Sequence, residues 1–113
     1  MTPILRHPKT TTGLEDWGPV PNMIDGSSMT SVLVLHIGSN GESESGIWVC
    51  TPCYWRCEVT RDEVCHFLEG RCTYTHESGE VIEIVPDTIA FFPAGRKGTC
   101  RVHDTVRKVY LMR

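Results

Sequence analysis

The sequence predicts an all-β domain built as an antiparallel sandwich or barrel, and three observations support this. Short apolar or β-branched stretches follow one another from about residue 31 onward, and turn residues separate them. No window of a dozen residues shows a 3.6-residue apolar period with helix caps, so we expect little helix. Roughly eight or nine short strands in one chain are typical of a two-sheet β architecture.

The expected elements can be assigned in chain order. Residues 1–30 carry scattered prolines and glycines without sustained periodicity, so we expect an irregular N-terminal arm there and a barrel over residues 31–113. The predicted strands cover residues 31–37, 46–50, 55–60, 63–68, 71–76, 81–85, 89–92, 99–103 and 105–112.

Local patterns justify individual elements. The Asn40-Gly41 pair supplies the positive φ angles of a tight turn between the first two strands. Trp55, Cys57 and Val59 alternate with polar residues, and this period of two predicts a strand with one buried face.

Size and composition exclude several classes of function. The 113 residues suit one domain, and the net charge of −3 with 22% charged residues gives no electrostatic footprint for nucleic acid. No apolar run approaches the roughly 20 residues needed to span a membrane. The N-terminal residues lack the apolar core of a secretion signal, so we expect a cytoplasmic protein whose six cysteines are buried free thiols.

Nine short motifs follow one another along the chain in a recognisable order. They are Trp48, Thr51-Pro52, Trp55, Asp62-Glu63-Val64-Cys65-His66, Glu69-Gly70, Glu77-Ser78-Gly79, Pro93-Ala94-Gly95, Gly98-Thr99 and Val106-Arg107-Lys108. In this order the chain resembles the cupin superfamily, and within it the small single-domain group similar to the cupin domain of (S)-ureidoglycine aminohydrolase. The resemblance implies a single-domain jelly-roll barrel of two antiparallel sheets, a homodimer, and a small-molecule ligand.

The resemblance also identifies where a metal would bind. Metal-dependent cupins carry two histidines two residues apart, then a glutamate, and a third histidine in a later motif. Glu63 matches the glutamate, while the histidine positions fall on Cys57, Val59 and Gly98. A first-row metal needs about four nitrogen, oxygen or sulfur donors. We therefore expect no standard cupin metal centre and no cofactor.

A loop one residue longer would move the histidine pair onto Arg56 and Glu58 instead. Either residue could then bind a charged ligand, because a guanidinium matches a carboxylate in bidentate geometry. The alternative is a cross-strand pair on the outer face of the sheet.

Glu63 is the main catalytic candidate. Facing an apolar cavity, it suits a general acid or base; the alternative is a structural ion pair with Arg56, Arg96 or Lys97. The residues expected to bind the ligand are Trp48, Arg56, Cys57, Glu58, Cys65 and Lys97.

The Cys50-Thr51-Pro52-Cys53 segment permits a redox or zinc interpretation, but the alternating residues after it indicate a strand rather than a helix N-terminus. We therefore expect a pocket for a small, polar, nitrogen-bearing carboxylate, with ureidoglycine aminohydrolase-like chemistry through Glu63 as one outcome. A non-catalytic metabolite sensor or accessory binding module is the alternative.

Overall fold

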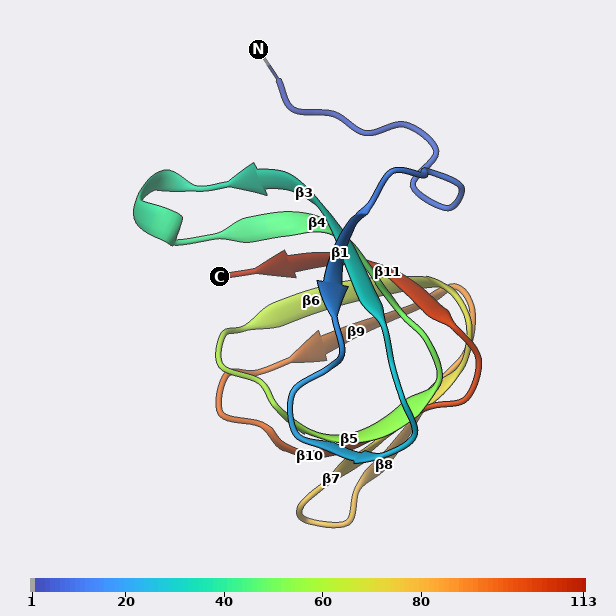
Figure 1. Cartoon of the computed structure of the whole chain (residues 1–113). Coiled ribbons are helices and arrows are strands. Elements are labelled where there is room, and N and C mark those ends of the chain that lie inside the picture. The colour runs from blue at the N-terminus through green and yellow to red at the C-terminus, as the bar shows by residue number, and fades with distance from the viewer. Residues whose placement is uncertain (1) are drawn as a thin grey trace.

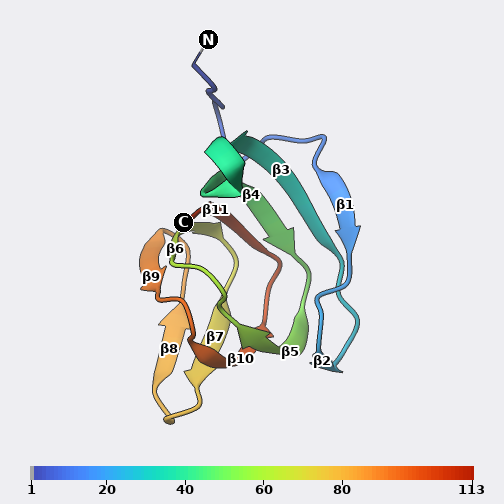
Figure 2. The ribbon, with the colours of Figure 1, turned by 90° about the vertical axis from the view of Figure 1, so that its left-hand side faces the viewer.

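Two antiparallel sheets face each other as the halves of a barrel in the computed structural model, which describes residues 2–113 (Figures 1 and 2). The six-stranded sheet has the order β1 (Glu15–Gly18), β3 (Thr30–Ile37), β4 (Glu44–Cys50), β11 (Val106–Met112), β6 (Glu63–Glu69) and β9 (Thr88–Phe92). The five-stranded sheet has the order β2 (Met23–Asp25), β5 (Cys53–Glu58), β10 (Lys97–Val102), β7 (Cys72–His76) and β8 (Val81–Ile84). This confirms the predicted two-sheet, all-β barrel.

The N-terminal segment contains more regular structure than the irregular arm predicted for residues 1–30. Strand β1 pairs with β3 along the edge of one sheet, and β2 pairs with β5 along the edge of the other. The hydroxyl of Thr30, on β3, donates to the carbonyl of Gly18, on β1, over 2.7 Å and strengthens the pairing of these two strands. Both strands are too short to show a period in the sequence, so only their pairing partners reveal them.

Residues 8–11, before β1, are held to the six-stranded sheet, whereas the start of the chain extends away from the barrel (Figure 1). The guanidinium of Arg107, on β11, donates to the carbonyl oxygens of Pro8 and Thr11, each over 3.1 Å. These contacts hold a segment without strands of its own onto a central strand of the sheet.

Two turns show how the chain reverses direction. Asn40 and Gly41 adopt φ angles of 57° and 70° in the short 3-10 turn η1 (Ser39–Gly41), as the Asn-Gly pair predicts. Asp87, between β8 and β9, also has a positive φ of 65°. Its carboxylate lies 2.8 Å from Nε2 of His66, and its backbone N–H donates to the Phe67 carbonyl over 2.7 Å. These contacts hold a conformation that aspartate tolerates better than most residues.

The inner faces of the two sheets form one core. Its fully buried side chains include Phe67 and Phe92 from the first sheet, and the ring of Tyr74 from the second packs against Phe92 at 4.7 Å between centroids. Along β5, Trp55 and Cys57 are partly buried while Arg56 and Glu58 are exposed, as the period of two predicts.

The outer face near the edge strand β9 is apolar. Leu111, Val64 and Phe91 lie in one row across β11, β6 and β9, and Phe91 is 58% exposed. Ile89, two residues along β9, is 72% exposed. Within residues 2–113, no helix is long and apolar enough to cross a membrane.

Candidate functional site

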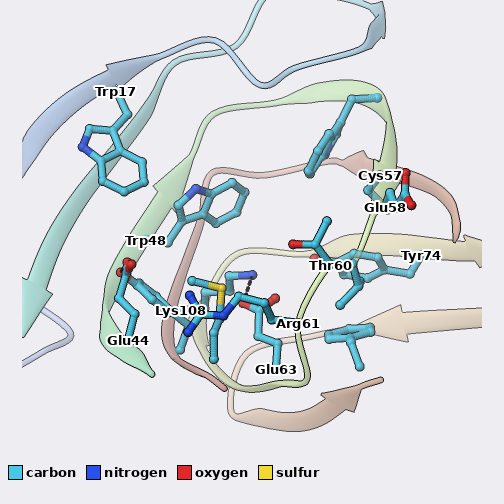
Figure 3. Close-up of a pocket in the computed structure, with 15 residues that line it drawn as sticks. Trp17, Glu44, Trp48, Cys57, Glu58, Thr60, Arg61, Glu63, Tyr74 and Lys108 are labelled. Carbon is cyan, nitrogen blue, oxygen red and sulfur yellow. Dashed lines mark hydrogen bonds and ion pairs between the residues drawn. The ribbon is translucent and has the colours of Figure 1, made fainter. Parts of the chain in front are cut away.

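A cavity of about 260 Å³ lies between the two sheets and is called the inner cavity below (Figure 3). It is lined by Trp17, Glu44, Trp48, Trp55, Cys57, Glu58, Val59, Thr60, Arg61, Glu63, Tyr74, Phe92, Lys108, Tyr110 and Met112. All three tryptophans of the chain therefore reach this one space. A concave site that combines aromatic walls with several polar groups is the usual form of a small-molecule pocket.

The polar centre of the inner cavity is an ion pair between Lys108 and Glu63. Nζ of Lys108 lies 3.1 Å from Oε2 of Glu63, as the dashed line in Figure 3 marks. The side chains are only 10% and 16% exposed. The thiol of Cys65 donates to the same Glu63 oxygen over 3.3 Å. One carboxylate oxygen thus accepts hydrogen bonds from an ammonium and a thiol in a partly dry interior.

Strand geometry brings these groups together. In β11, Val106, Lys108 and Tyr110 alternate inward, and all three are buried. Met112, at the end of β11, is the register partner of Glu63 on β6. Lys108 lies four residues away on the same inner face, and its long side chain reaches along the sheet to the carboxylate.

The aromatic walls also hold Lys108. Its Nζ lies 4.7 Å from the ring centroid of Trp48 and 5.7 Å from that of Phe67, within the range of cation–π attraction. Burial by itself would lower the pKa of Lys108, but the neighbouring Cys65 and the Glu63 carboxylate outweigh it and raise the pKa. Lys108 therefore remains an ammonium at neutral pH.

A second polar pair lies beside the first. The hydroxyl of Tyr110 donates to Oε2 of Glu44 over 2.5 Å, and both residues line the inner cavity. Burial, together with this hydrogen bond and the charge of Glu44, raises the pKa of Tyr110, so the phenol keeps its proton. With Glu58 at the end of β5, the cavity consequently has a carboxylate on each of three strands, β4, β5 and β6.

The thiols near the cavity are poor nucleophiles at neutral pH. Burial, chiefly, raises the pKa of Cys57 to about 11 and that of Cys65 to about 12. Nucleophilic chemistry at cysteine needs the thiolate. Covalent chemistry through these two thiols is therefore disfavoured at neutral pH.

The sequence-predicted site residues divide between two places. Trp48, Cys57, Glu58 and Glu63 line the inner cavity, and the buried Cys65 contacts Glu63 from behind. The other two candidates, Arg56 and Lys97, line a separate hollow of about 490 Å³ with Asn22, Thr75, His76, Glu77, Gly98 and Thr99. Cys57 and Glu58 border both spaces.

The cation that pairs with Glu63 is Lys108, and it is none of the three that the sequence suggested as partners for a structural ion pair. Arg56 and Lys97 line the separate hollow, and Arg96 pairs with Glu80 over 3.2 Å. Lys108 takes that place instead. In the sequence, Lys108 is marked only as a charged residue at one position of an alternating strand. A shift of the strand register by one residue would point its side chain outward, so the alternation alone does not place it in the cavity.

Glu44, Tyr110 and Arg61 were also missed. Glu44 and Tyr110 meet across neighbouring strands, and Arg61 lies in the loop after β5, where its guanidinium donates to the carbonyl of Gly41 over 3.0 Å. No local motif marks such cross-strand and loop contacts.

A standard cupin metal centre does not fit the residues of this site. The positions that correspond to the three histidines carry the thiol of Cys57, the alkyl group of Val59 and no side chain at Gly98. Gly98 is the register partner of Cys57, and a Cβ there would overlap the carbonyl oxygen of Thr75. Among residues 2–113, no group of three or more histidine, cysteine or acidic side chains is arranged to hold a metal.

The Cys50–Cys53 pair lies apart from the inner cavity. The sulfur atoms are 3.8 Å apart, both residues are buried, and they lie on β4 and β5 rather than at a helix N-terminus. Burial, followed by the proximity of Cys53, raises the pKa of Cys50 well above that of an ordinary thiol. This environment differs from that of the reactive cysteines in thiol redox enzymes.

Comparison with known proteins places the barrel in context. The sequence pattern that defines the EutQ-like cupin domain matches residues 37–110. A protein of unknown function from Pseudomonas syringae superposes with a TM-score of 0.82 at 20% identity, over 90% of this chain and 45% of its own length. The chain thus spans less than half of that protein.

Two further solved structures share the fold. A putative ethanolamine utilization protein from Salmonella typhimurium has a TM-score of 0.66 at 20% identity, over 84% of this chain and 76% of its own. Ectoine synthase from P. lautus has a TM-score of 0.67 at 16% identity, over 81% and 68%. A search of curated proteins gives no significant match.

Proposed function

The chain belongs to the EutQ-like cupin family, and from that premise we propose that it binds a small, polar metabolite carrying both a nitrogen group and a carboxylate. The observation that supports this proposal is the pairing of a buried ammonium with acidic and aromatic side chains around one small cavity. A volume of about 260 Å³ is just below the usual range of about 300–1,000 Å³ for ligand pockets, so the ligand is the size of an amino acid.

Each part of such a ligand has a complementary group. A carboxylate would be attracted to Nζ of Lys108, which forms a charge-assisted hydrogen bond with Glu63. An amino or ureido nitrogen would find acceptors in the carboxylates of Glu44 and Glu58 and the faces of the tryptophan rings. Trp17, from β1, is 51% exposed and lies at the margin of the cavity.

The tryptophans give a direct test. In a two-dimensional NMR spectrum the three indole N–H groups report on the inner cavity, because no other tryptophan exists in the chain. The ligand panel would contain glycine, (S)-ureidoglycine, ectoine, ethanolamine and acetate. Ligands with both groups should shift the indole signals of Trp48 and Trp55 in a saturable way. If every member leaves these signals unchanged at millimolar concentration, the proposal is wrong.

Catalysis is a second candidate function, and the position of Glu63 favours it. Its carboxylate lines the cavity and accepts hydrogen bonds from an ammonium and a thiol, which hold it in position to take a proton from a bound ligand. Ureidoglycine-type chemistry is carried here by the sequence resemblance alone. Glu63→Gln distinguishes the two functions: an enzyme should lose turnover while it still binds ligand, whereas a sensor or accessory module has no turnover in either form.

A further inference from the structure

Lys108 lies beside the one residue that matches a metal ligand of metal-dependent cupins. In those proteins the glutamate equivalent to Glu63 would contact the metal, together with three histidines. Here the same carboxylate contacts the Lys108 ammonium at 3.1 Å, and the histidine positions are occupied by Cys57, Val59 and Gly98. The positive charge at this point of the barrel is therefore carried by a side chain of the protein.

The two arrangements exclude each other physically. A divalent ion that bound Glu63 would approach a buried ammonium, and like charges repel strongly where water is scarce. Lys108 is only 10% exposed and lies among Trp48 and Phe67, so its ammonium has little room to turn into solvent. The third metal-binding histidine of the cupin pattern also has no room here, because any side chain at position 98 would overlap the backbone of Thr75.

The ammonium has bonding capacity left over. It carries three N–H donors; Oε2 of Glu63 accepts one of them, and the sulfur of Cys65 is a second hydrogen-bonding neighbour of Nζ. The Trp48 ring covers another side of the cation. Because Lys108 lines the inner cavity, a donor remains for an anionic atom of whatever occupies that space.

We propose that Lys108 takes the place of the metal, and that the inner cavity binds a carboxylate directly through Nζ of Lys108 by a metal-independent contact. This inference rests on the proposed function for the existence of a ligand, but it adds the group that recognises the ligand and the independence from metal.

The test uses acetate and its neutral isostere acetamide as probes, titrated into the full chain with the Trp48 indole signal as readout. Acetate should bind the wild-type protein at least tenfold more tightly than acetamide does. Its affinity should not change when EDTA or excess Zn²⁺ or Mn²⁺ is added. Lys108→Met should weaken acetate binding at least tenfold and leave acetamide binding unchanged, and Lys108→Arg should restore part of the loss.

Lys108→Met leaves Glu63 without its partner and could unfold the barrel, so Lys108→Met/Glu63→Gln, which removes both charges, serves as the second variant. Equal binding of acetate to wild type and to this double variant would overturn the inference, as would loss of acetate binding on adding EDTA. Absence of acetate binding to the wild-type protein up to about 100 mM, a hundredfold above a millimolar Kd, would also overturn it.

Failure here is distinguishable from failure of the proposed function. A larger ligand that shifts the tryptophan signals equally in wild type and in Lys108→Met would leave the proposed function intact while removing Lys108 from recognition. If no member of the ligand panel shifts the tryptophan signals, both the proposed function and the role of Lys108 are refuted.

Discussion

Replacing Lys108 by methionine tests the physical basis of the site without any ligand. Methionine keeps most of the length of the apolar stem and removes the charge, so Glu63 is left as a carboxylate that is 16% exposed and has lost its ammonium partner. Removing one partner of a buried ion pair costs about 3–5 kcal/mol. The loss of the cation–π contact with Trp48 adds roughly 0.5–1 kcal/mol.

The expected effect is a large fraction of the total stability, because a domain of this size unfolds with about 5–15 kcal/mol. We expect Lys108→Met to lower the free energy of unfolding by about 3.5 kcal/mol, the low end of the two costs together, since the hydrogen bond from Cys65 to Glu63 is retained. Urea denaturation followed by tryptophan fluorescence measures this as a fall in midpoint at constant slope.

Two further variants make the reasoning refutable. Lys108→Met/Glu63→Leu removes both charges and should recover most of the loss, because apolar replacement of a buried pair is often neutral or stabilising. Lys97→Met removes an exposed lysine and should stay within about 0.5 kcal/mol of wild type. A single variant as stable as wild type, or a double variant no better than the single one, would show that the pair is not buried as described.

Three other predictions follow from the structure. Gly98→Ala should lose about 2 kcal/mol or more in the same urea assay, because its Cβ overlaps the Thr75 carbonyl, and a neutral substitution would contradict that packing. Cys57 is the least buried of the six cysteines, and burial raises its pKa to about 11. The rate at which it reacts with an aromatic disulfide reagent should therefore rise roughly tenfold per pH unit from pH 7 to 10, because only the thiolate reacts. A reaction rate that levels off near pH 8 would contradict this environment. The homodimer expected from the resemblance would use the apolar row that ends in Phe91 on the edge strand β9. Light scattering should then give twice the chain mass of 12.7 kDa, and Phe91→Lys should give the mass of the monomer. A monomeric wild-type protein would refute this pairing.

The fold was predictable because its signals are local. Alternation after Trp55 and the Asn40-Gly41 turn both depend on neighbouring residues, and each has its expected structural counterpart. Strands β1 and β2 were not predictable in this way. They have four and three residues, and their only reason to be extended is the edge strand that each one finds in space.

The candidate site was predictable in part. Glu63 could be placed because the spacing to Gly70 carries over from the cupin pattern, and the structure has it lining the cavity. Lys108 is separated from Glu63 by 45 residues, and its contact depends on the register between β11 and β6 as well as on a bulge between Arg107 and Lys108. A shift of one residue would have sent this side chain to the outer face, so nothing in the sequence alone determines the pairing.

The register of β11 also explains why the cation and the altered ligand positions occur in one barrel. Lys108 projects inward from the first sheet toward the cavity, whereas Cys57 and Gly98 lie opposite each other on the second sheet. An imidazole at position 57 would share the small cavity with a buried ammonium, and one at position 98 would first have to displace the backbone of Thr75. A metal bound there would compete with Lys108 for the same oxygen of Glu63, at 3.1 Å from Nζ. Because one carboxylate cannot neutralise both cations in a space with little water, the lysine and the metal are alternatives at this point of the fold.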